Sequence, residues 1–182
     1  MPSNAYDAKG LLLRAIRDNN PVVFVEHKAL YKLKTEVPEE AYEVGYESEV
    51  KQAGEDITII SYSAMVNVAL KAAKKLQEEG IRAEVIDVKS IEPLDMAPIL
   101  QSIKKTGHAV IVHEAVKKSG FGGEIVAQIQ EFAFESLKKP ILRVTAPDVP
   151  VPFARNLEMA YVPDETQVIE AVKVTLKGGE GE

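Results

Sequence analysis

Cysteine is absent from the 182 residues. The chain therefore cannot form disulfides, use a thiolate nucleophile, or hold zinc or iron–sulfur clusters through cysteine. Long apolar runs are absent too, because stretches such as Val22–Val25 and Ala109–Val112 are far shorter than the ~20 residues of a membrane helix. Residues 1–7 lack the basic and apolar regions of a secretion signal. We expect a soluble chain that does not bind membranes, and a cytoplasmic location fits this composition.

Blocks of positive charge are also missing. Lys and Arg number 22 against 28 Asp and Glu, which gives a formal net charge of −6. An acidic chain of this kind is a poor candidate for binding nucleic acid. Hydrophobic residues at 46% and charged residues at 27% are typical of a globular protein rather than a disordered one.

Short β-branched runs alternate with helical patterns along the chain. The runs predict five strands, at Val22–Glu26, Asp56–Ser61, Arg82–Val88, Ala109–His113 and Ile141–Thr145. Nearly continuous apolar runs of this kind are typical of parallel strands that are covered on both faces.

Four helices are predicted between and after these strands. Ser63 is expected to cap a helix over 64–79 that ends at Gly80, and Asp95 a helix that ends before Gly107. The third follows the glycines at 120–123, with Ile125, Val126, Ile129 and Phe132 toward the core, and the fourth runs from about Glu165 to Leu176. This order predicts a three-layer α/β/α domain with a mostly parallel sheet over residues 46–177.

The first 45 residues do not fit that domain. Residues 8–16 have a helical pattern, and with the strand at Val22–Glu26 they make one helix–strand unit, which is too small to bury a core of its own. We interpret 1–27 as the remnant of another domain, 28–45 as an extended linker, and 178–182 as a disordered tail.

The motifs offer no convincing active site. Gly120–Gly123 follows a strand and precedes a helix, but the dinucleotide spacing fails at Ile125 and no Lys-Ser/Thr follows. Close packing of the turn is the preferred interpretation, and nucleotide binding is a weak alternative. His113-Glu114 is not part of an HExxH motif. The carboxylates Glu26, Asp87 and Glu114 lie near strand ends, where solvated edge residues are the default explanation. The residues themselves predict no catalytic, cofactor-binding or metal-ligating group.

Several segments nevertheless resemble one enzyme family in order along residues 1–176. They are Pro2–Leu12, Asn20–Lys28, Val37–Glu40, Ile59–Val66, Glu84–Asp87, Pro93–Asp95, Gly120–Glu124 and Pro147–Ala154 with Leu157-Glu158. The chain resembles the C-terminal part of the beta subunit of the thiamine-diphosphate-dependent decarboxylating component of 2-oxoacid dehydrogenase complexes, which is similar to transketolase. Within the family the chain is most similar to pyruvate dehydrogenase, and branched-chain 2-oxoacid and acetoin dehydrogenases are the alternatives.

The resemblance implies a transketolase C-terminal-like domain that follows the last helix–strand unit of a truncated pyrimidine-binding domain. It implies thiamine diphosphate and Mg²⁺ as cofactors of the complete enzyme, bound between alpha and beta subunits of an alpha-two-beta-two tetramer. The family's catalytic glutamate and histidine belong to the part that precedes Met1. We therefore expect this chain alone to bind no cofactor and to be inactive.

The resemblance also implies a surface that docks the basic peripheral-subunit-binding domain of the dihydrolipoyl acyltransferase. Lys138 and Lys139 occupy the matching stretch, with Lys138 in place of the family's acidic residue, and the Gly-Gly-Glu-Gly-Glu extension displaces the family's C-terminus. Glu135, Glu180 and Glu182 are the candidates for restoring negative charge there. The alternative function is a freestanding interaction module, for which we expect self-association through exposed apolar faces.

Overall fold

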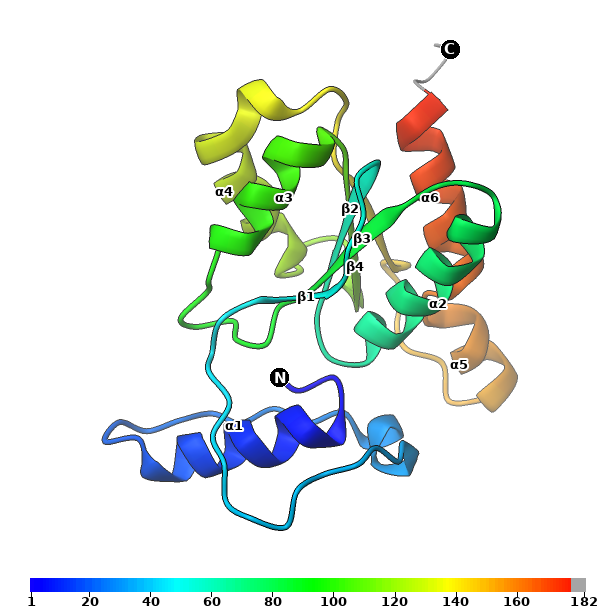
Figure 1. Cartoon of the computed structure of the whole chain (residues 1–182). Helices are drawn as coiled ribbons and strands as arrows, with labels where there is room; N and C mark the ends of the chain where they lie inside the picture. The colour runs from blue at the N-terminus through cyan, green and yellow to red at the C-terminus, as the bar shows by residue number, and fades with distance from the viewer. Residues whose placement is uncertain (178–182) are drawn as a thin grey trace.

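A five-stranded sheet forms the centre of the molecule in the computed structural model, which describes residues 1–177 (Figure 1). The strands are β1 (Glu49–Gln52), β2 (Ile57–Ser61), β3 (Ala83–Asp87), β4 (Ala109–Val116) and β5 (Leu142–Ala146), in the order β1-β3-β2-β4-β5. Strands β3, β2, β4 and β5 are parallel, and β1 is antiparallel to β3. The predicted parallel sheet is confirmed, and four of its five predicted strands are present.

Helices cover both faces of this sheet (Figure 1). On one face, α2 (Ala64–Glu78) and α6 (Glu165–Lys177) bury an apolar cluster that includes Ile59, Leu76 and Val172. On the other face, α3 (Ala97–Thr106) and α4 (Gly122–Ala133) bury a second cluster around Ile86 and Ile111. The three-layer prediction is confirmed.

Two of the predicted helix ends are confirmed and one cap is wrong. Gly80 and Gly107 have positive φ angles of 83° and 73° after α2 and α3, a conformation that glycine adopts without strain. Ser63 does not cap α2, because its backbone has φ 53° and ψ −134° and its side chain accepts no helix amide. Asp95 lies one residue before the N-cap position, which Met96 occupies. Its Oδ1 accepts from the amide of Ala97, the first residue of α3, at 3.0 Å.

Phe132 is a further correction. It was expected in the core, but 56% of its surface is exposed. In the last turn of α4 the buried residue is Ala133, and Phe132 projects to solvent.

The sequence patterns missed two elements. β1 is an edge strand of mixed polar residues, Glu-Val-Lys-Gln, and it has no apolar alternation to identify it. The short helix α5 (Arg155–Tyr161) has no buried residues, so no apolar stripe marks it.

The N-terminal segment contains a helix but no strand. α1 (Ala5–Arg17) is present, whereas the predicted strand at Val22–Glu26 is extended chain without a strand partner. A strand requires the edge of a sheet for its backbone hydrogen bonds, and this segment lies beyond the carboxyl ends of the parallel strands, away from any edge (Figure 1). The prediction of a helix–strand unit is wrong in this respect.

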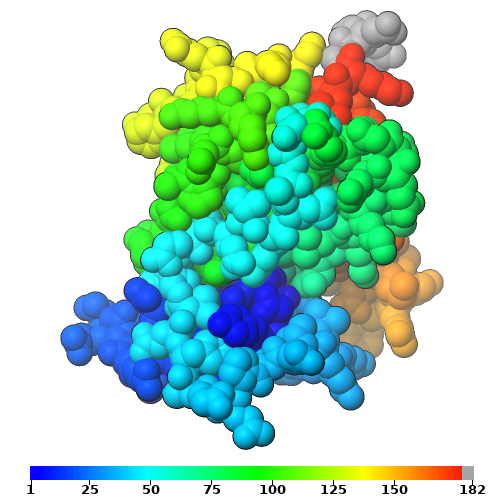
Figure 2. All heavy atoms as spheres, in the orientation of Figure 1, coloured from blue at the N-terminus to red at the C-terminus, as the bar shows by residue number. Residues whose placement is uncertain are grey.

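The segment between η1 (Lys28–Lys32) and β1 wraps around α1. Figure 2 shows the first residues, in dark blue, enclosed on this face by light-blue and cyan atoms of the following segment. The Tyr6 and Tyr42 rings stack with centroids 4.5 Å apart, and the Tyr42 hydroxyl donates to the Tyr6 carbonyl at 2.8 Å. Because Gly10 has no side chain, Val44 and Tyr42 approach the helix closely there. No helix within residues 1–177 is long and apolar enough to cross a membrane.

Candidate functional site

A candidate ligand site lies at the carboxyl ends of β2 and β4. The chain proceeds from β2 to β3 on one side and from β4 to β5 on the other, so the topology reverses between β2 and β4. In open α/β sheets, ligands bind in the crevice at such a switch point. A cleft of about 530 Å³ opens there.

Residues from several connections line this cleft, which we call the switch-point cleft. They include Tyr62, Ser63 and Met65 after β2, Glu114, Ser119 and Phe121 from the β4–α4 region, Ile91, and Glu158, Tyr161 and Val162 from the α5 region, with His27 from the N-terminal segment. The N-terminal segment therefore closes one side of the cleft.

His27 and Glu114 meet at the rim. His27 Nε2 lies 2.7 Å from Glu114 Oε2, and His27 Nδ1 accepts from the Ala29 amide at 3.2 Å. Since Nδ1 is an acceptor, the proton is on Nε2, which donates to the carboxylate. The sequence placed these residues 87 positions apart and gave no sign of their pairing.

Tyr62 is the polar side chain that the sequence patterns missed. Only 9% of its surface is exposed, and it lines the cleft. Burial raises the pKa of Tyr62 to about 12, so the hydroxyl keeps its proton at neutral pH. A neutral hydroxyl can both donate and accept a hydrogen bond.

The glycine-rich turn packs against His113. A Cβ at Gly120 would lie 2.5 Å from His113 Cε1, and one at Gly122 would lie 2.5 Å from His113 Cδ2. The His113 ring is fully buried and stacks parallel to Tyr62 at 6.2 Å. Burial lowers the pKa of His113, so the ring is neutral at pH 7. The turn-packing interpretation of Gly120–Gly123 is confirmed.

The three strand-end carboxylates do not cluster. Glu26 accepts from the Tyr31 hydroxyl at 2.9 Å, Asp87 accepts from the Ser3 hydroxyl at 2.5 Å, and Glu114 pairs with His27. Burial raises the pKa of Asp87 to about 6, against the opposing effects of the Ser3 hydrogen bond and Lys51. Each carboxylate therefore has its own partner, and the shared site that sequence left open is absent.

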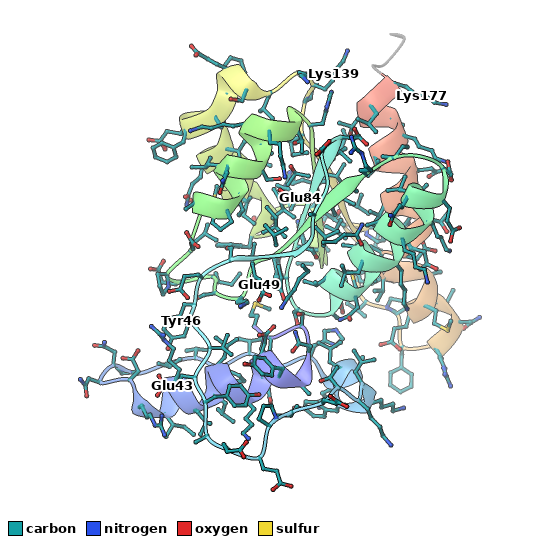
Figure 3. The ribbon with its side chains drawn as sticks, viewed as in Figure 1. Glu43, Tyr46, Glu49, Glu84, Lys139 and Lys177 are labelled. Atoms are coloured by element: carbon teal, nitrogen blue, oxygen red, sulfur yellow. The ribbon has the colours of Figure 1, made fainter. Side chains whose placement is uncertain are left out.

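A charged cluster joins α1 to the sheet. Lys51 Nζ lies 3.1 Å from Asp7 Oδ2 and 2.8 Å from Glu49 Oε2, and Lys89 Nζ lies 2.5 Å from the same Glu49 oxygen. Figure 3 shows Glu49 where the chain enters the sheet, between α1 and the sheet's carboxyl end. The buried Asp7 carboxylate thus has a cation beside it, as a buried charge requires.

The predicted docking residues lie at the opposite end of the molecule. Glu135 is exposed in η2 (Phe134–Ser136), and Lys138 and Lys139 are exposed before β5. Figure 3 shows Lys139 and Lys177 at the end farthest from α1. The aliphatic part of Lys138 lies against Gly107. Glu180 and Glu182 lie outside the described residues.

The family model described as "Transketolase, C-terminal domain" matches residues 46–168. The chain belongs to this family.

The chain is also similar to beta subunits of two kinds of bacterial enzyme. It is 47% identical over 180 residues to the pyruvate dehydrogenase E1 component subunit beta of Bacillus subtilis, which covers 97% of this chain and 55% of the relative. It is 46% identical over 179 residues to the acetoin:2,6-dichlorophenolindophenol oxidoreductase subunit beta of Cupriavidus necator, with coverage of 98% and 53%. The chain spans about half the length of these curated relatives.

Solved structures of similar fold include the one titled "Split gene transketolase, inactive beta4 tetramer", with a TM-score of 0.63, 29% identity, and coverage of 80% of this chain and 46% of that one. The likeness supports the transketolase-like fold that was predicted.

Proposed function

We propose that this chain is the C-terminal portion of a pyruvate dehydrogenase-type beta subunit. In the complete enzyme it would support thiamine-diphosphate-dependent oxidative decarboxylation of a 2-oxoacid and acyl transfer to lipoamide. The observation that carries the proposal is 47% identity to the Bacillus subtilis beta subunit over 97% of this chain. A beta subunit for acetoin or a branched-chain 2-oxoacid stays the alternative, since the Cupriavidus necator relative is 46% identical. We propose a cytoplasmic location for the enzyme.

The N-terminal segment supports this division of the subunit. We propose that residues 1–27 complete a pyrimidine-binding domain, that 28–45 link it to the domain at 46–177, and that 178–182 form a tail. Ile16, Val22, Val23 and Val25 are exposed apolar side chains. They are the surface on which the rest of such a domain would pack.

Thiamine diphosphate and Mg²⁺ do not fit the residues present. No group of three or more acidic or histidine side chains in residues 1–177 could hold a metal ion. The Gly120–Gly123 turn is occupied by its packing on His113, so it does not offer a free diphosphate cradle. We propose that both cofactors bind only in the complete enzyme, between this subunit and an alpha subunit.

Calorimetry tests this proposal directly. Titration of thiamine diphosphate with Mg²⁺ into the 182-residue chain is expected to give no saturable heat, and the chain is expected to release no CO₂ from pyruvate. Tight saturable binding would contradict the proposal. The complete Bacillus subtilis subunit with its alpha subunit is the positive control.

The docking of an acyltransferase is a finer proposal. We propose that the surface with Glu135, Lys138 and Lys139, together with Glu180 and Glu182, meets the peripheral-subunit-binding domain. Because that domain is basic in the family, Lys138 opposes its approach, and Lys138→Glu is expected to strengthen binding. Lys74→Glu, on the exposed face of α2, is the matched charge control. If both variants and the parent bind the peripheral-subunit-binding domain equally well, the proposal that this surface docks it is wrong.

A freestanding interaction module is the second candidate. Its support is a set of exposed apolar side chains around α5, at Val149, Val151, Phe153, Leu157 and Met159, besides those of the N-terminal segment. The split-gene relative is described as a tetramer of its beta chain. Self-association of this chain is the corresponding proposal.

A further inference from the structure

The His113 ring is buried without a hydrogen bond. None of its surface is exposed, and neither ring nitrogen has a hydrogen-bond partner within residues 1–177. Glu114, the next residue along β4, pairs with His27 instead. Most buried polar groups in proteins have a partner, and leaving one without a partner costs free energy. His113 is therefore an unusual group to find at the end of a central strand.

The surroundings of the His113 ring disfavour a positive charge on it. The ring stacks on Tyr62, a neutral phenol that follows β2, and the glycines of the Gly120–Gly123 turn pack on its other atoms. Burial lowers the pKa of His113, and the Arg143 guanidinium on β5 adds to this effect, against the opposing effect of the Ala115 backbone. A proton on this ring would therefore place a charge in the core that no bonded carboxylate of the described residues balances.

The segment that covers the ring, which we call the 117–122 turn, is held in a strained conformation. Ser119 has a φ of 59°, in the left-handed region that costs free energy for residues other than glycine. Arg143 Nη1 donates to the Lys117 carbonyl at 2.9 Å and ties the turn to β5. Ser119 and the two residues after it line the switch-point cleft. Opening of this turn would therefore change the wall of the cleft.

We propose that the 117–122 turn is an acid-sensitive latch on the switch-point cleft, and that it opens when His113 takes up a proton. The neutral ring stays beneath the glycines and the turn is closed. The protonated ring leaves this site for water, and the turn opens while the sheet stays folded. Because the open turn binds a proton that the closed turn does not, acid favours the open form. The latch depends neither on thiamine diphosphate nor on the upstream half of the subunit, so it and the proposed function fail separately.

Hydrogen exchange of the complete 182-residue chain at pH 7.5 and pH 5.5, corrected for the intrinsic exchange rates, tests the latch. The Gly123 and Glu124 amides report on it, because they donate to carbonyls of the turn. Their protection is expected to fall about tenfold between the two pH values, since a released His113 titrates near its ordinary value of 6.5. The Thr58 amide, which is bonded within the sheet, is expected to show no such fall. An equal fall at Thr58, or none at Gly123 and Glu124, would overturn the proposal, because opening would then be global or absent.

Variants identify the group that takes up the proton. His113→Phe keeps a ring beneath the glycines and does not titrate, so the protection of the Gly123 amide is expected to be equal at the two pH values. His108→Gln is the matched control, because His108 precedes β4 and lies outside the turn, and it should keep the fall seen in the parent. A fall in His113→Phe as large as in the parent would assign the effect to another group and overturn the proposal.

An NMR titration of the parent chain tests the same claim without a variant. The His113 ring is expected to titrate with a midpoint below its ordinary value of 6.5, because the closed turn resists the proton. A midpoint at or above that value would show that the closed turn accepts the charge, and the proposal would be wrong.

Discussion

Two neighbouring glycines of α4 have opposite surroundings. A Cβ at Gly122 would meet the buried His113 ring at 2.5 and 2.6 Å, whereas one at Gly123 would meet only the end of Arg143 at 3.3 Å. The buried ring cannot move away, because it lies fully buried beneath the turn and beside Tyr62. The first glycine is therefore required by packing and the second is not.

Gly122→Ala is expected to destabilise the protein by about 1–3 kcal/mol, as an overpacked core does. Gly123→Ala is the matched control, and it should be neutral or stabilising by up to about 1 kcal/mol, because alanine restricts the unfolded chain. Urea unfolding measures both. Equal stabilities of the two variants would contradict the packing of the turn on His113.

The Asp87 carboxyl makes the stability of the protein depend on pH. Folding raises its pKa from 3.8 to about 6, so between these values the native state binds more protons than the unfolded chain. Stability from this group therefore falls as the pH rises from about 4 to 6. The change corresponds to on the order of 3 kcal/mol.

Asp87→Asn isolates this effect, because asparagine does not titrate. The stability of the variant relative to the parent is expected to improve by on the order of 3 kcal/mol between pH 4 and pH 7.5. Urea unfolding at several pH values measures the difference. A difference that does not change with pH would show that the Asp87 carboxyl is not buried as described.

At the scale of elements, α1 is held to the rest of the chain by few apolar contacts. Leu11 is 2% exposed, while the next residue, Leu12, is 42% exposed. The Tyr6–Tyr42 stack and the approach of Val44 to Gly10 add to this contact, and Asp7 with Lys51 is a polar attachment. Leu11 is the large apolar side chain that the helix buries.

Leu11→Ala is expected to cost about 2–5 kcal/mol in the stability of the docked helix, and Leu12→Ala within about 0.5 kcal/mol. Hydrogen exchange of the α1 amides measures this, because a weakened helix opens before the sheet does. If the α1 amides exchange equally slowly in both variants, Leu11 does not anchor the helix.

The elements that could be predicted are those with a regular apolar pattern. β2 and β3 are buried throughout, β4 is buried over its first five residues, and α2 and α6 show one apolar face, so periodicity sufficed. β1 and α5 lack such a pattern. Val22–Glu26 has the composition of a strand, but pairing depends on a neighbouring edge that composition does not reveal.

The candidate site was largely beyond the sequence, because it is built from pairs that are distant along the chain. His27 and Glu114 were each visible as polar residues, but only the fold brings them to 2.7 Å. Tyr62 belongs to a segment that resembles the family, and its place in the cleft has no signature in one sequence. The Gly120–Gly123 turn was interpreted correctly because its failed spacing was itself visible.

At the scale of the whole molecule, the exposed apolar residues of the N-terminal segment predict association. Sedimentation velocity over micromolar concentrations is expected to show a dimer or larger species, as large apolar patches are typical of interfaces. Ile16→Lys with Val23→Lys, at exposed positions, should shift the chain toward monomer. A parent chain that is monomeric at every concentration would contradict this prediction.

The central claim is that this chain is the C-terminal half of a thiamine-dependent beta subunit. The most direct test joins the part of the Bacillus subtilis beta subunit that precedes the matched region to this chain, and coexpresses the chimera with the Bacillus subtilis alpha subunit. We predict CO₂ release from pyruvate that requires thiamine diphosphate and Mg²⁺, and none when this chain alone is combined with the alpha subunit. A folded chimera that binds the alpha subunit without activity, or activity of this chain without the added half, would contradict the claim.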